Sequence, residues 1–238
     1  MEKGICTQSA IAIRKEHSHA SEMVSQLLYN ELYTKLDEVG GWTLIRTEHD
    51  QYEGWIWTKQ HHAISEEEFE KLKASPMYLT NQPILELDGR LLSFGTPLYA
   101  PHAAAAAMPE VFDPALMIEN AKKLLDVPYL WGGRTVMGID CSGFVQLCAR
   151  MAGLLLPRDA SQQIGCGELV YFLQEALPGD LAFFCNEEGY ISHVGIVMAD
   201  EQIIHASGKV RIDYLDQTGI FNKETGTHTH LLEGIKRL

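Results

Sequence analysis

The sequence lacks an excess of basic residues and lacks long hydrophobic runs. Its 238 residues include 19 Lys and Arg against 32 Asp and Glu, which gives a formal net charge of −13. Such an acidic chain disfavours nonspecific binding to nucleic acid or to anionic lipid. Apolar stretches such as 169–173 and 194–199 are far shorter than the roughly 18 residues that a membrane-spanning helix needs. We therefore expect neither nucleic acid nor a membrane as a partner.

The sequence also lacks paired cysteines. It has five, an odd number, and no two of them have the CxxC spacing of a metal site. This argues against a disulfide framework and against a thiolate zinc site. The segment from Met1 to Cys6 has no apolar core of the kind found in secretory signals. These features predict a cytoplasmic protein with free thiols that needs no metal and no cofactor.

The length predicts one or two domains, and the two halves of the chain differ in pattern. Residues 5–58 contain short apolar segments separated by turn residues, which predicts the strands of a small barrel. A helix is predicted at Ser65–Lys73, where serine caps a run of acidic residues, and further short strands are predicted at 78–99. Residues 101–109, with five alanines between prolines, are predicted to be a linker or a short helical spacer.

The second half predicts helices first and antiparallel strands after them, which is an α+β pattern. One helix is predicted to begin at Asp113-Pro114, and a second to run from about Cys141 to Ala152 after a glycine-rich turn. Apolar runs predict strands at 181–185, 191–198, 202–206, 210–215 and 231–237.

Cys141 lies at the start of the second predicted helix. The positive end of a helix dipole and its unpaired N–H groups lower the pKa of a thiol and can stabilise an oxyanion. We therefore expect Cys141 to be a nucleophile with a lowered pKa. A cysteine in an apolar helix is more often an ordinary core residue; this is the alternative for Cys141 and our interpretation of Cys148.

Two histidines on neighbouring predicted strands can supply the base that a thiol nucleophile needs. His193 begins one strand and His205, 12 residues later, ends the next, which fits an antiparallel hairpin that turns at Asp200-Glu201. On such a hairpin the two imidazoles can meet, and His205 can orient His193. The alternative is that each is a structural, hydrogen-bonded residue. The remaining paired histidines lack matching ligands and are interpreted as surface residues: His17 and His19, His61 and His62, and His228 and His230.

Six segments of the second half follow one another in a specific order. They are Tyr129–Gly133, Asp140–Phe144, Leu156–Asp159, Pro178–Phe184, His193–Ile196 and Ile204-His205. Their order and spacing resemble the NlpC family of cell-wall cysteine peptidases over residues 113–238. The resemblance implies a papain-like fold with Cys141 as nucleophile, His193 as base and His205 as the residue that orients it. It further implies substrate contacts at Trp131, Asp140, Ser142 and Asp159.

Two segments of the first half, Ser21–Leu28 and Asp50–Trp55, resemble the bacterial SH3-like domain. A barrel of this kind before the peptidase resembles the γ-D-glutamyl-L-diamino acid endopeptidases, which cut murein peptides with a free N-terminal L-Ala. The resemblance implies that the barrel closes one end of the cleft and that Glu22 and Tyr52 bind the amino end of the substrate. The alternatives are a solvated surface charge for Glu22 and plain packing for Tyr52 and Trp131.

Two positions depart from that family pattern, and one arginine has more than one possible partner. Ala160 stands where some members carry serine, which removes one possible hydrogen bond to substrate, and Tyr29 replaces a common glycine. Arg158 is expected to pair with Asp159 or with a substrate carboxylate, and we favour a structural role for it.

The expected architecture is α+β: an all-β SH3-like barrel with a short helix at residues 1–105, then a papain-like peptidase domain at residues 112–238. The expected function is cysteine endopeptidase, cutting the γ-D-glutamyl–diamino acid bond of murein peptides with a free N-terminal L-Ala during cell-wall peptide recycling. The expected partner is the murein-derived peptide L-Ala-γ-D-Glu-diamino acid. The alternatives are another amidase or acyltransferase acting on murein-derived substrates, and a catalytically inactive murein-binding module.

Overall fold

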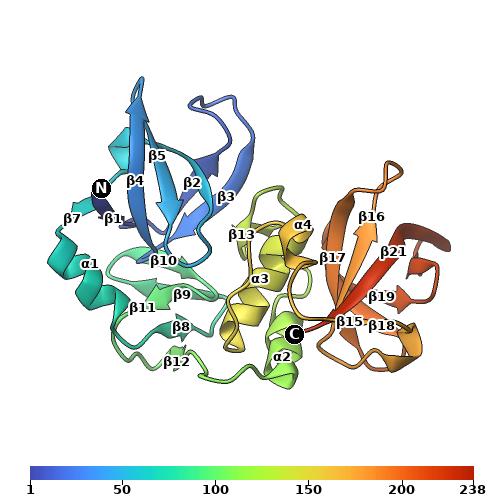
Figure 1. Cartoon of the computed structure of the whole chain (residues 1–238). Coiled ribbons are helices and arrows are strands. Elements are labelled where there is room, and N and C mark those ends of the chain that lie inside the picture. Colours follow the sequence, from blue (N-terminus) through green and yellow to red (C-terminus); the bar gives the residue numbers. More distant parts are fainter. The chain divides into compact units, whose positions relative to one another are not determined.

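The computed structural model describes residues 1–238, which form two compact units (Figure 1). Unit 1 consists of residues 1–108 and 130–138, and unit 2 consists of residues 109–129 and 139–238. Residues 130–138 therefore pack within unit 1, although they lie inside the second half of the sequence. None of the helices has both the length and the apolar character required to cross a membrane.

Unit 1 is built on a seven-stranded antiparallel sheet with the strand order β3-β2-β6-β5-β4-β1-β7. Its strands are β1 (Lys3–Ile5), β2 (Ala10–Arg14), β3 (Met23–Leu28), β4 (Leu32–Val39), β5 (Trp42–Thr47), β6 (Glu53–Trp57) and β7 (Ala63–Ile64), with a 3-10 turn at Thr58–Gln60 after β6. Alternate residues of these strands form one buried cluster, which includes Ile11, Ile13, Leu27, Ile45 and Ile56.

The helix α1 (Glu66–Lys73) confirms the prediction made from its capping residue. The side chain of Ser65 accepts a hydrogen bond from the backbone N–H of Glu68 at 3.1 Å, and acidic residues fill the first turn. The strands that follow are β8 (Tyr78–Thr80), β9 (Ile84–Leu87), β10 (Arg90–Ser93), β11 (Pro97–Leu98) and β12 (Ala105–Ala107).

The alanine stretch is neither a linker nor a helical spacer, so that prediction was wrong. Ala105–Ala107 forms the strand β12, which pairs antiparallel with β8. Ala104, just before it, is buried against Leu85, Leu92 and Leu98. The edge of β8 offers backbone hydrogen bonds, and those bonds outweigh the helical preference of alanine.

The segment 130–138 is held in unit 1 by a buried arginine. Arg134 is 1% exposed and donates two hydrogen bonds to the carboxylate of Glu31, at 2.9 and 3.0 Å. Its guanidinium also donates to the carbonyl of Gln26 at 2.6 Å, and its backbone N–H donates to the Gln26 side chain at 2.7 Å. Gly132 has φ +75°, and a Cβ there would lie 2.3 Å from the carbonyl oxygen of Met23, so only glycine lets the segment lie this close to β3.

Unit 2 contains three helices and a closed ring of six antiparallel strands. The helices are α2 (Pro114–Lys123), α3 (Cys141–Met151) and α4 (Ala160–Gln163). The strands of unit 2 are β15 (Glu168–Val170), β16 (Leu181–Cys185), β17 (Ile191–Met198), β18 (Gln202–Ser207), β19 (Lys209–Leu215), β20 (Gly219–Asn222) and β21 (Thr227–Arg237), and a 3-10 turn lies at Leu173–Glu175. In the segment 130–138 of unit 1, the short strand β13 (Arg134–Thr135) pairs with β14 (Gly138–Ile139), which precedes α3.

The ring closes because β20 pairs with β21 in addition to its neighbour β19. The five strands that the sequence predicted in this half are confirmed. The sequence did not predict β15 or β20, and β21 begins at Thr227 rather than at Leu231. The segment Thr227–His230 is polar, so its sequence carries no apolar signal for the extra strand length.

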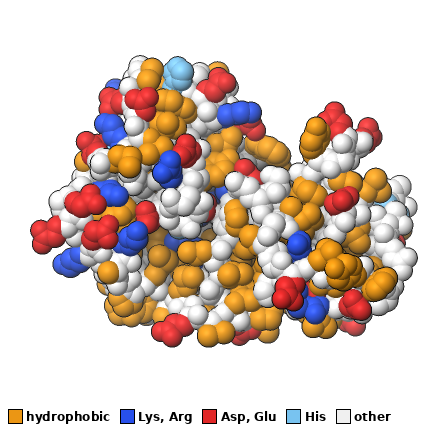
Figure 2. Space-filling view, viewed as in Figure 1, with side chains coloured by type: hydrophobic (Ala, Val, Ile, Leu, Met, Phe, Trp, Pro, Cys, Tyr) orange, Lys and Arg blue, Asp and Glu red, His pale blue; other side chains and the backbone are white.

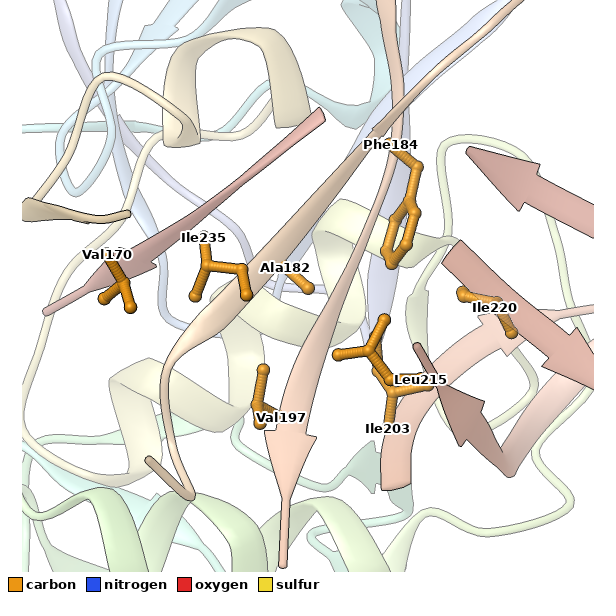
Figure 3. Close-up of a cluster of buried hydrophobic side chains, with 8 residues drawn as sticks. All are labelled: Val170, Ala182, Phe184, Val197, Ile203, Leu215, Ile220 and Ile235. Atoms are coloured by element: carbon orange, nitrogen blue, oxygen red, sulfur yellow. The ribbon is translucent and has the colours of Figure 1, made fainter. Parts of the chain in front are cut away.

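The ring encloses an apolar core, drawn in Figure 3. Each of its strands contributes an inward side chain, and β15 contributes one more: Val170, Ala182, Phe184, Val197, Ile203, Leu215, Ile220 and Ile235. These residues alternate with outward-facing ones along each strand, as a small closed barrel requires. The outward face of β17 contacts α3 and α4. A rigid ring thus supports the helix that begins at Cys141.

The surface carries no extended field of one sign on the face shown in Figure 2. Acidic and basic side chains are intermixed over unit 1 on that face. In unit 2, hydrophobic side chains gather near β15, and the exposed apolar residues of this segment are Leu169, Tyr171, Phe172 and Leu177.

We predict that Arg134→Ala lowers the free energy of unfolding of unit 1 by about 3–5 kcal/mol, because the variant removes the guanidinium that pairs with the buried carboxylate of Glu31. All four tryptophans of the chain lie in unit 1, so tryptophan fluorescence during urea unfolding of the full chain reports this loss. Arg46→Ala is the matched control, since the pair Arg46–Glu53 is exposed and contributes less than about 1 kcal/mol. Equal losses in the two variants would contradict the prediction.

Candidate active site

Cys141 is the first residue of α3, and Asp140 caps that helix. The carboxylate of Asp140 accepts a hydrogen bond from the backbone N–H of Gly143 at 2.7 Å. Every residue of α3 is buried, because the helix packs against α2, α4, β17 and β18. The predicted helix start is therefore confirmed, and the nucleophile candidate stands on a helix that is enclosed on all sides.

Arg158 pairs with Asp140, a partner that the sequence analysis did not name. The guanidinium donates to the two carboxylate oxygens of Asp140, at 3.0 and 2.6 Å, and also to the hydroxyl oxygen of Ser142 at 2.9 Å. Arg158 and Asp140 are both buried, so this bidentate pair fixes the start of α3. Asp140 and Ser142 thus have partners within the protein, and the substrate contacts expected of them stay predictions.

Burial raises the pKa of the Cys141 thiol to about 12, and the negative charge of Asp140 adds to the effect. The backbone N–H groups of Val194 and Ser142 and the charge of Arg158 act in the opposite direction without overcoming it. The prediction of a lowered pKa was therefore wrong. A thiolate loses more hydration in this buried position than the helix terminus restores. The contact with Val194 places the sulfur beside the backbone of β17, next to His193.

His193 and His205 meet on the predicted hairpin. β17 and β18 pair antiparallel, with Gly195 opposite His205, and Nε2 of His193 lies 2.8 Å from Nδ1 of His205. Both side chains are buried. A Cβ on Gly195 would lie 2.9 Å from the Cβ of His205, so glycine at this position lets the second histidine lie against β17.

Strand alternation explains why these polar side chains share the interior of the ring. His193 lies on the same face of β17 as the core residue Val197, and His205 lies on the same face of β18 as Ile203. The ring of Phe184 contacts His193 from the opposite strand, with centroids 5.8 Å apart. One end of the barrel interior is thus apolar, and the other end holds the histidines.

The structure adds Asp213, which the sequence reading missed. Its Oδ2 lies 3.1 Å from Nε2 of His205, and it is 1% exposed. Arg211 donates to both of its carboxylate oxygens, at 2.6 and 3.0 Å. Alternation gives a signal that could have identified this residue, because Asp213 shares a face of β19 with the core residue Leu215 and occupies the strand next to His205.

His230 was predicted to be a surface residue, and this was wrong. Its ring is stacked on that of His193, with centroids 4.2 Å apart and planes inclined by 28°. The polar segment that carries it is the early part of β21, which closes the ring. His193 and His230 line an open pocket of about 240 Å³ together with Tyr129, Ser192, Ala206, Ser207 and Gly208.

Burial lowers the pKa of all three histidines at this end of the ring. It holds the pKa of His193 well below its usual value, helped by the charges of His205 and His230. It also lowers the pKa of His205, although Asp213 acts in the opposite direction, and it lowers that of His230 to about 4. The imidazoles are therefore neutral at pH 7, and His193 can accept a proton.

The substrate-contact candidates outside this cluster lie in both units. In unit 1 the indole N–H of Trp131 donates to Oε1 of Glu22 at 2.7 Å, and both side chains are substantially exposed. Tyr52 lies at the turn before β6, where its backbone N–H donates to the Thr47 hydroxyl oxygen at 2.9 Å. In unit 2 Asp159 precedes α4. The structure thus brings Glu22 and Trp131 together, through the segment 130–138.

No group of three or more His, Cys, Asp or Glu side chains is arranged to hold a metal ion. All five cysteines are free thiols, three of them buried.

Two protein families match separate parts of the chain. Residues 126–229 match the NlpC/P60 family, and residues 13–60 match the bacterial dipeptidyl-peptidase SH3 domain. The chain contains an NlpC/P60 domain. The SH3-like domain precedes it, and the family resemblance read from the sequence is confirmed. Cys141, His193, His205 and Asp213 all fall within the NlpC/P60 match.

Curated relatives match under half of the chain. A γ-D-glutamyl-L-lysine dipeptidyl-peptidase of Bacillus subtilis is 39% identical over 113 residues, which are 45% of this chain and 38% of the relative. A γ-DL-glutamyl hydrolase of the same species is 42% identical over 115 residues, 46% of this chain and 28% of the relative. The matches thus span well under half the length of these relatives.

Solved structures share the fold over the whole chain. An NlpC/P60 family protein from Bacillus cereus has a TM-score of 0.80 at 19% identity and covers 99% of both chains. An NlpC/P60 endopeptidase from Photobacterium damselae has a TM-score of 0.72 at 14% identity and covers 98% of this chain and 70% of its own. At these identities the likeness concerns the fold alone.

We predict that the free energy of unfolding falls as the pH is lowered from 6.5 toward 4. Over this range the unfolded chain binds protons that the buried His193 and His205 and the half-buried His230 do not bind in the folded state, because desolvation lowers the pKa values of all three. His230→Ala removes one of these groups and should make the dependence shallower. Urea unfolding followed by circular dichroism measures it, with His62→Ala, at an exposed position, as the control. A variant as steep as the wild type would refute the assignment to His230.

Proposed function

We propose that this protein is a cysteine endopeptidase that hydrolyses the γ-D-glutamyl–diamino acid bond of murein peptides with a free N-terminal L-Ala. The observation that carries the proposal is the set Cys141, His193, His205 and Asp213 in one domain. A thiol at the start of an enclosed helix lies beside the strand of a neutral histidine, and that histidine is held by a second one. The set supports the proposed papain-like arrangement, with Cys141 as nucleophile, His193 as base and His205 as the orienting residue.

The hydrogen bond between His193 and His205 supports one order of proton transfers. Nε2 of His193 is bonded to His205, so Nδ1 is the nitrogen left to take the proton from the Cys141 thiol. The thiolate attacks the γ-glutamyl carbonyl carbon, and the oxyanion is stabilised by N–H groups at the start of α3. When the intermediate collapses, the C–N bond breaks and the imidazolium of His193 gives its proton to the leaving amine. Water then attacks the acyl-enzyme, with His193 as base again, and releases the acid.

Charge is the basis for the proposed requirement for a free amine. The ammonium of an unblocked L-Ala must meet carboxylates when it loses hydration. Glu22 can supply one: its side chain is exposed, and one of its oxygens accepts from Trp131. Asp159 is the corresponding candidate in unit 2, and Tyr52 remains a candidate for the same end of the substrate. The names of the two dipeptidyl-peptidase relatives, from Bacillus subtilis and Bacillus cereus, support a γ-D-glutamyl bond as the target.

The proposed setting is cytoplasmic recycling of murein peptides. In intact wall the L-Ala amine is joined to muramic acid, so an enzyme that needs a free amine acts on released peptides. The five free thiols support a reducing compartment.

The rival with specific support is a hydrolase of other γ-glutamyl bonds, since one relative is a γ-DL-glutamyl hydrolase. An amidase or acyltransferase on the same domain would use the same cysteine and histidines. A murein-binding module without catalysis is disfavoured, because the thiol, the neutral base and the hydrogen-bonded histidine are all in place.

We predict that Cys141→Ala abolishes hydrolysis of L-Ala-γ-D-Glu-diamino acid tripeptides while the protein stays folded, because the thiol forms the acyl-enzyme. Mass spectrometry of the products and the near-ultraviolet circular dichroism spectrum check the two halves of this expectation. Cys148→Ala is the matched control, since Cys148 is buried on the same helix. A folded Cys141→Ala protein that still releases L-Ala-D-Glu would exclude the mechanism.

We predict that N-acetylation of the tripeptide lowers kcat/KM by more than tenfold, a loss above ~1.4 kcal/mol. Acetylation removes the ammonium charge and leaves its carboxylate partners desolvated without a counter-charge. Glu22→Gln, which keeps the acceptor for Trp131 but removes the charge, should lower kcat/KM for the free tripeptide only. Glu53→Gln, at an exposed glutamate of the same unit, is the control. Equal kcat/KM values for free and acetylated peptide would favour the rival reactions.

A further inference from the structure

We propose that Asp213 is a positioning residue that sets which nitrogen of each relay histidine carries a proton, so that His193 presents an unprotonated Nδ1 to Cys141. Asp213 lies on β19, two strands away from His193, and reaches the base only through His205. For catalysis the inference rests on the proposed function, but the protonation pattern itself can be observed without any substrate.

The ionisation of Asp213 depends on its burial and on its hydrogen bonds with His205 and Arg211. Burial by itself raises the pKa of this carboxyl, but hydrogen bonds from His205 and Arg211 outweigh burial and hold the pKa well below its usual value. Arg211 donates to both oxygens, and neither Asp213 nor His205 is more than 1% exposed. Asp213 is therefore a carboxylate, which can only accept hydrogen bonds.

The carboxylate of Asp213 determines which nitrogens carry protons along the hydrogen-bonded chain Asp213–His205–His193. Because Oδ2 of Asp213 only accepts, Nε2 of His205 must carry the proton in the 3.1 Å contact between them. In a neutral imidazole the other nitrogen is then an acceptor. Nδ1 of His205 must accept from Nε2–H of His193 across 2.8 Å, and this leaves Nδ1 of His193 with its lone pair. A single carboxylate thus determines the tautomers of two histidines.

His205 remains neutral although it lies beside a carboxylate. Burial lowers the pKa of His205, and the nearby charge of Arg211 lowers it further, against the pull of Asp213. Arg211 is itself held at 3.1 Å from Glu224 and 3.2 Å from the side-chain oxygen of Asn222. Asp213 therefore orients His205 without drawing a second proton into the cluster, which also contains His193 and His230.

The proton balance in the reaction is simple. One proton leaves the Cys141 sulfur and binds Nδ1 of His193, which becomes an imidazolium whose Nε2–H still donates to His205. His205 and Asp213 keep the protonation states they had before. The same proton later passes from His193 to the leaving amine. Asp213 touches neither substrate nor thiol, so it positions rather than catalyses.

The direct test uses the wild-type full chain labelled with ¹⁵N histidine. Nitrogen shifts and two-bond couplings in NMR spectra identify the tautomer of each imidazole, and Cys141→Ala, His193→Gln and His205→Gln spectra assign the signals. We expect both His193 and His205 as Nε2–H tautomers at neutral pH. A wild-type His193 in the Nδ1–H form would overturn the proposal, and this measurement needs no Asp213 variant that folds.

The second test is Asp213→Asn, whose amide can donate to His205 and reverse both tautomers. We expect alkylation of Cys141 by iodoacetamide, located by peptide mass spectrometry, to slow at least tenfold at neutral pH. We expect kcat for the tripeptide to fall at least tenfold while KM changes less than about threefold. Asp216→Asn is the matched control, because Asp216 bonds to the exposed His228 at 2.8 Å outside the relay and its removal should change neither rate.

Different results of these tests distinguish the inference about Asp213 from the proposed peptidase function. Unchanged alkylation and kcat in a folded Asp213→Asn protein, with His193 still in the Nε2–H form, would show that Asp213 only neutralises Arg211, and would overturn the inference. Slowed alkylation in a protein that hydrolyses no murein peptide would support the inference while refuting the proposed function. Circular dichroism establishes that the variant is folded before either rate is interpreted.

Discussion

The register between β17, β18 and β19 is the constraint on which the rest of the site depends. It sets Gly195 opposite His205, and it brings a carboxylate from β19 to the far side of the same imidazole. Since side chains alternate along a strand, a shift of one residue in either pairing would turn these groups to the outer face of the ring. The apolar core beneath them fixes the register, because the same shift would remove Val197 and Ile203 from the interior of the ring. Stability and chemistry therefore use the same strand pairing.

Much of this arrangement could be predicted from local sequence patterns. Serine and aspartate capping residues predicted the starts of α1 and α2, and a glycine-rich turn preceded the predicted start of α3. The 12-residue spacing of His193 and His205 predicted the hairpin. These features depend on neighbours in the sequence or on a single turn. The side chains that interact across several strands could not be predicted in this way. Asp213 reaches the site through the pairing of β18 with β19, and His230 reaches it because β21 closes the ring. The sequence signals that closure weakly, because β20 has only four residues and the early part of β21 is polar.

The ionisation of Cys141 shows a different limit of sequence reasoning. Its place at a helix terminus was predicted correctly, but the sign of its pKa shift was not, because burial is a property of the whole fold. Burial raises the pKa of the thiol, so in the proposed reaction a base that takes its proton matters more than the dipole of α3.

The placement of residues 130–138 has a consequence for how the gene can be divided. The nine-residue segment is encoded inside the NlpC/P60 region, yet Arg134 has its carboxylate partner, Glu31, in the N-terminal region. An isolated NlpC/P60 fragment would carry Arg134 without Glu31, and an isolated SH3-like fragment would carry Glu31 without Arg134. The two regions therefore cannot be exchanged independently of each other. Recombination between homologues would have to exchange this short insert together with the barrel that it completes, and their sequences would be expected to change in concert.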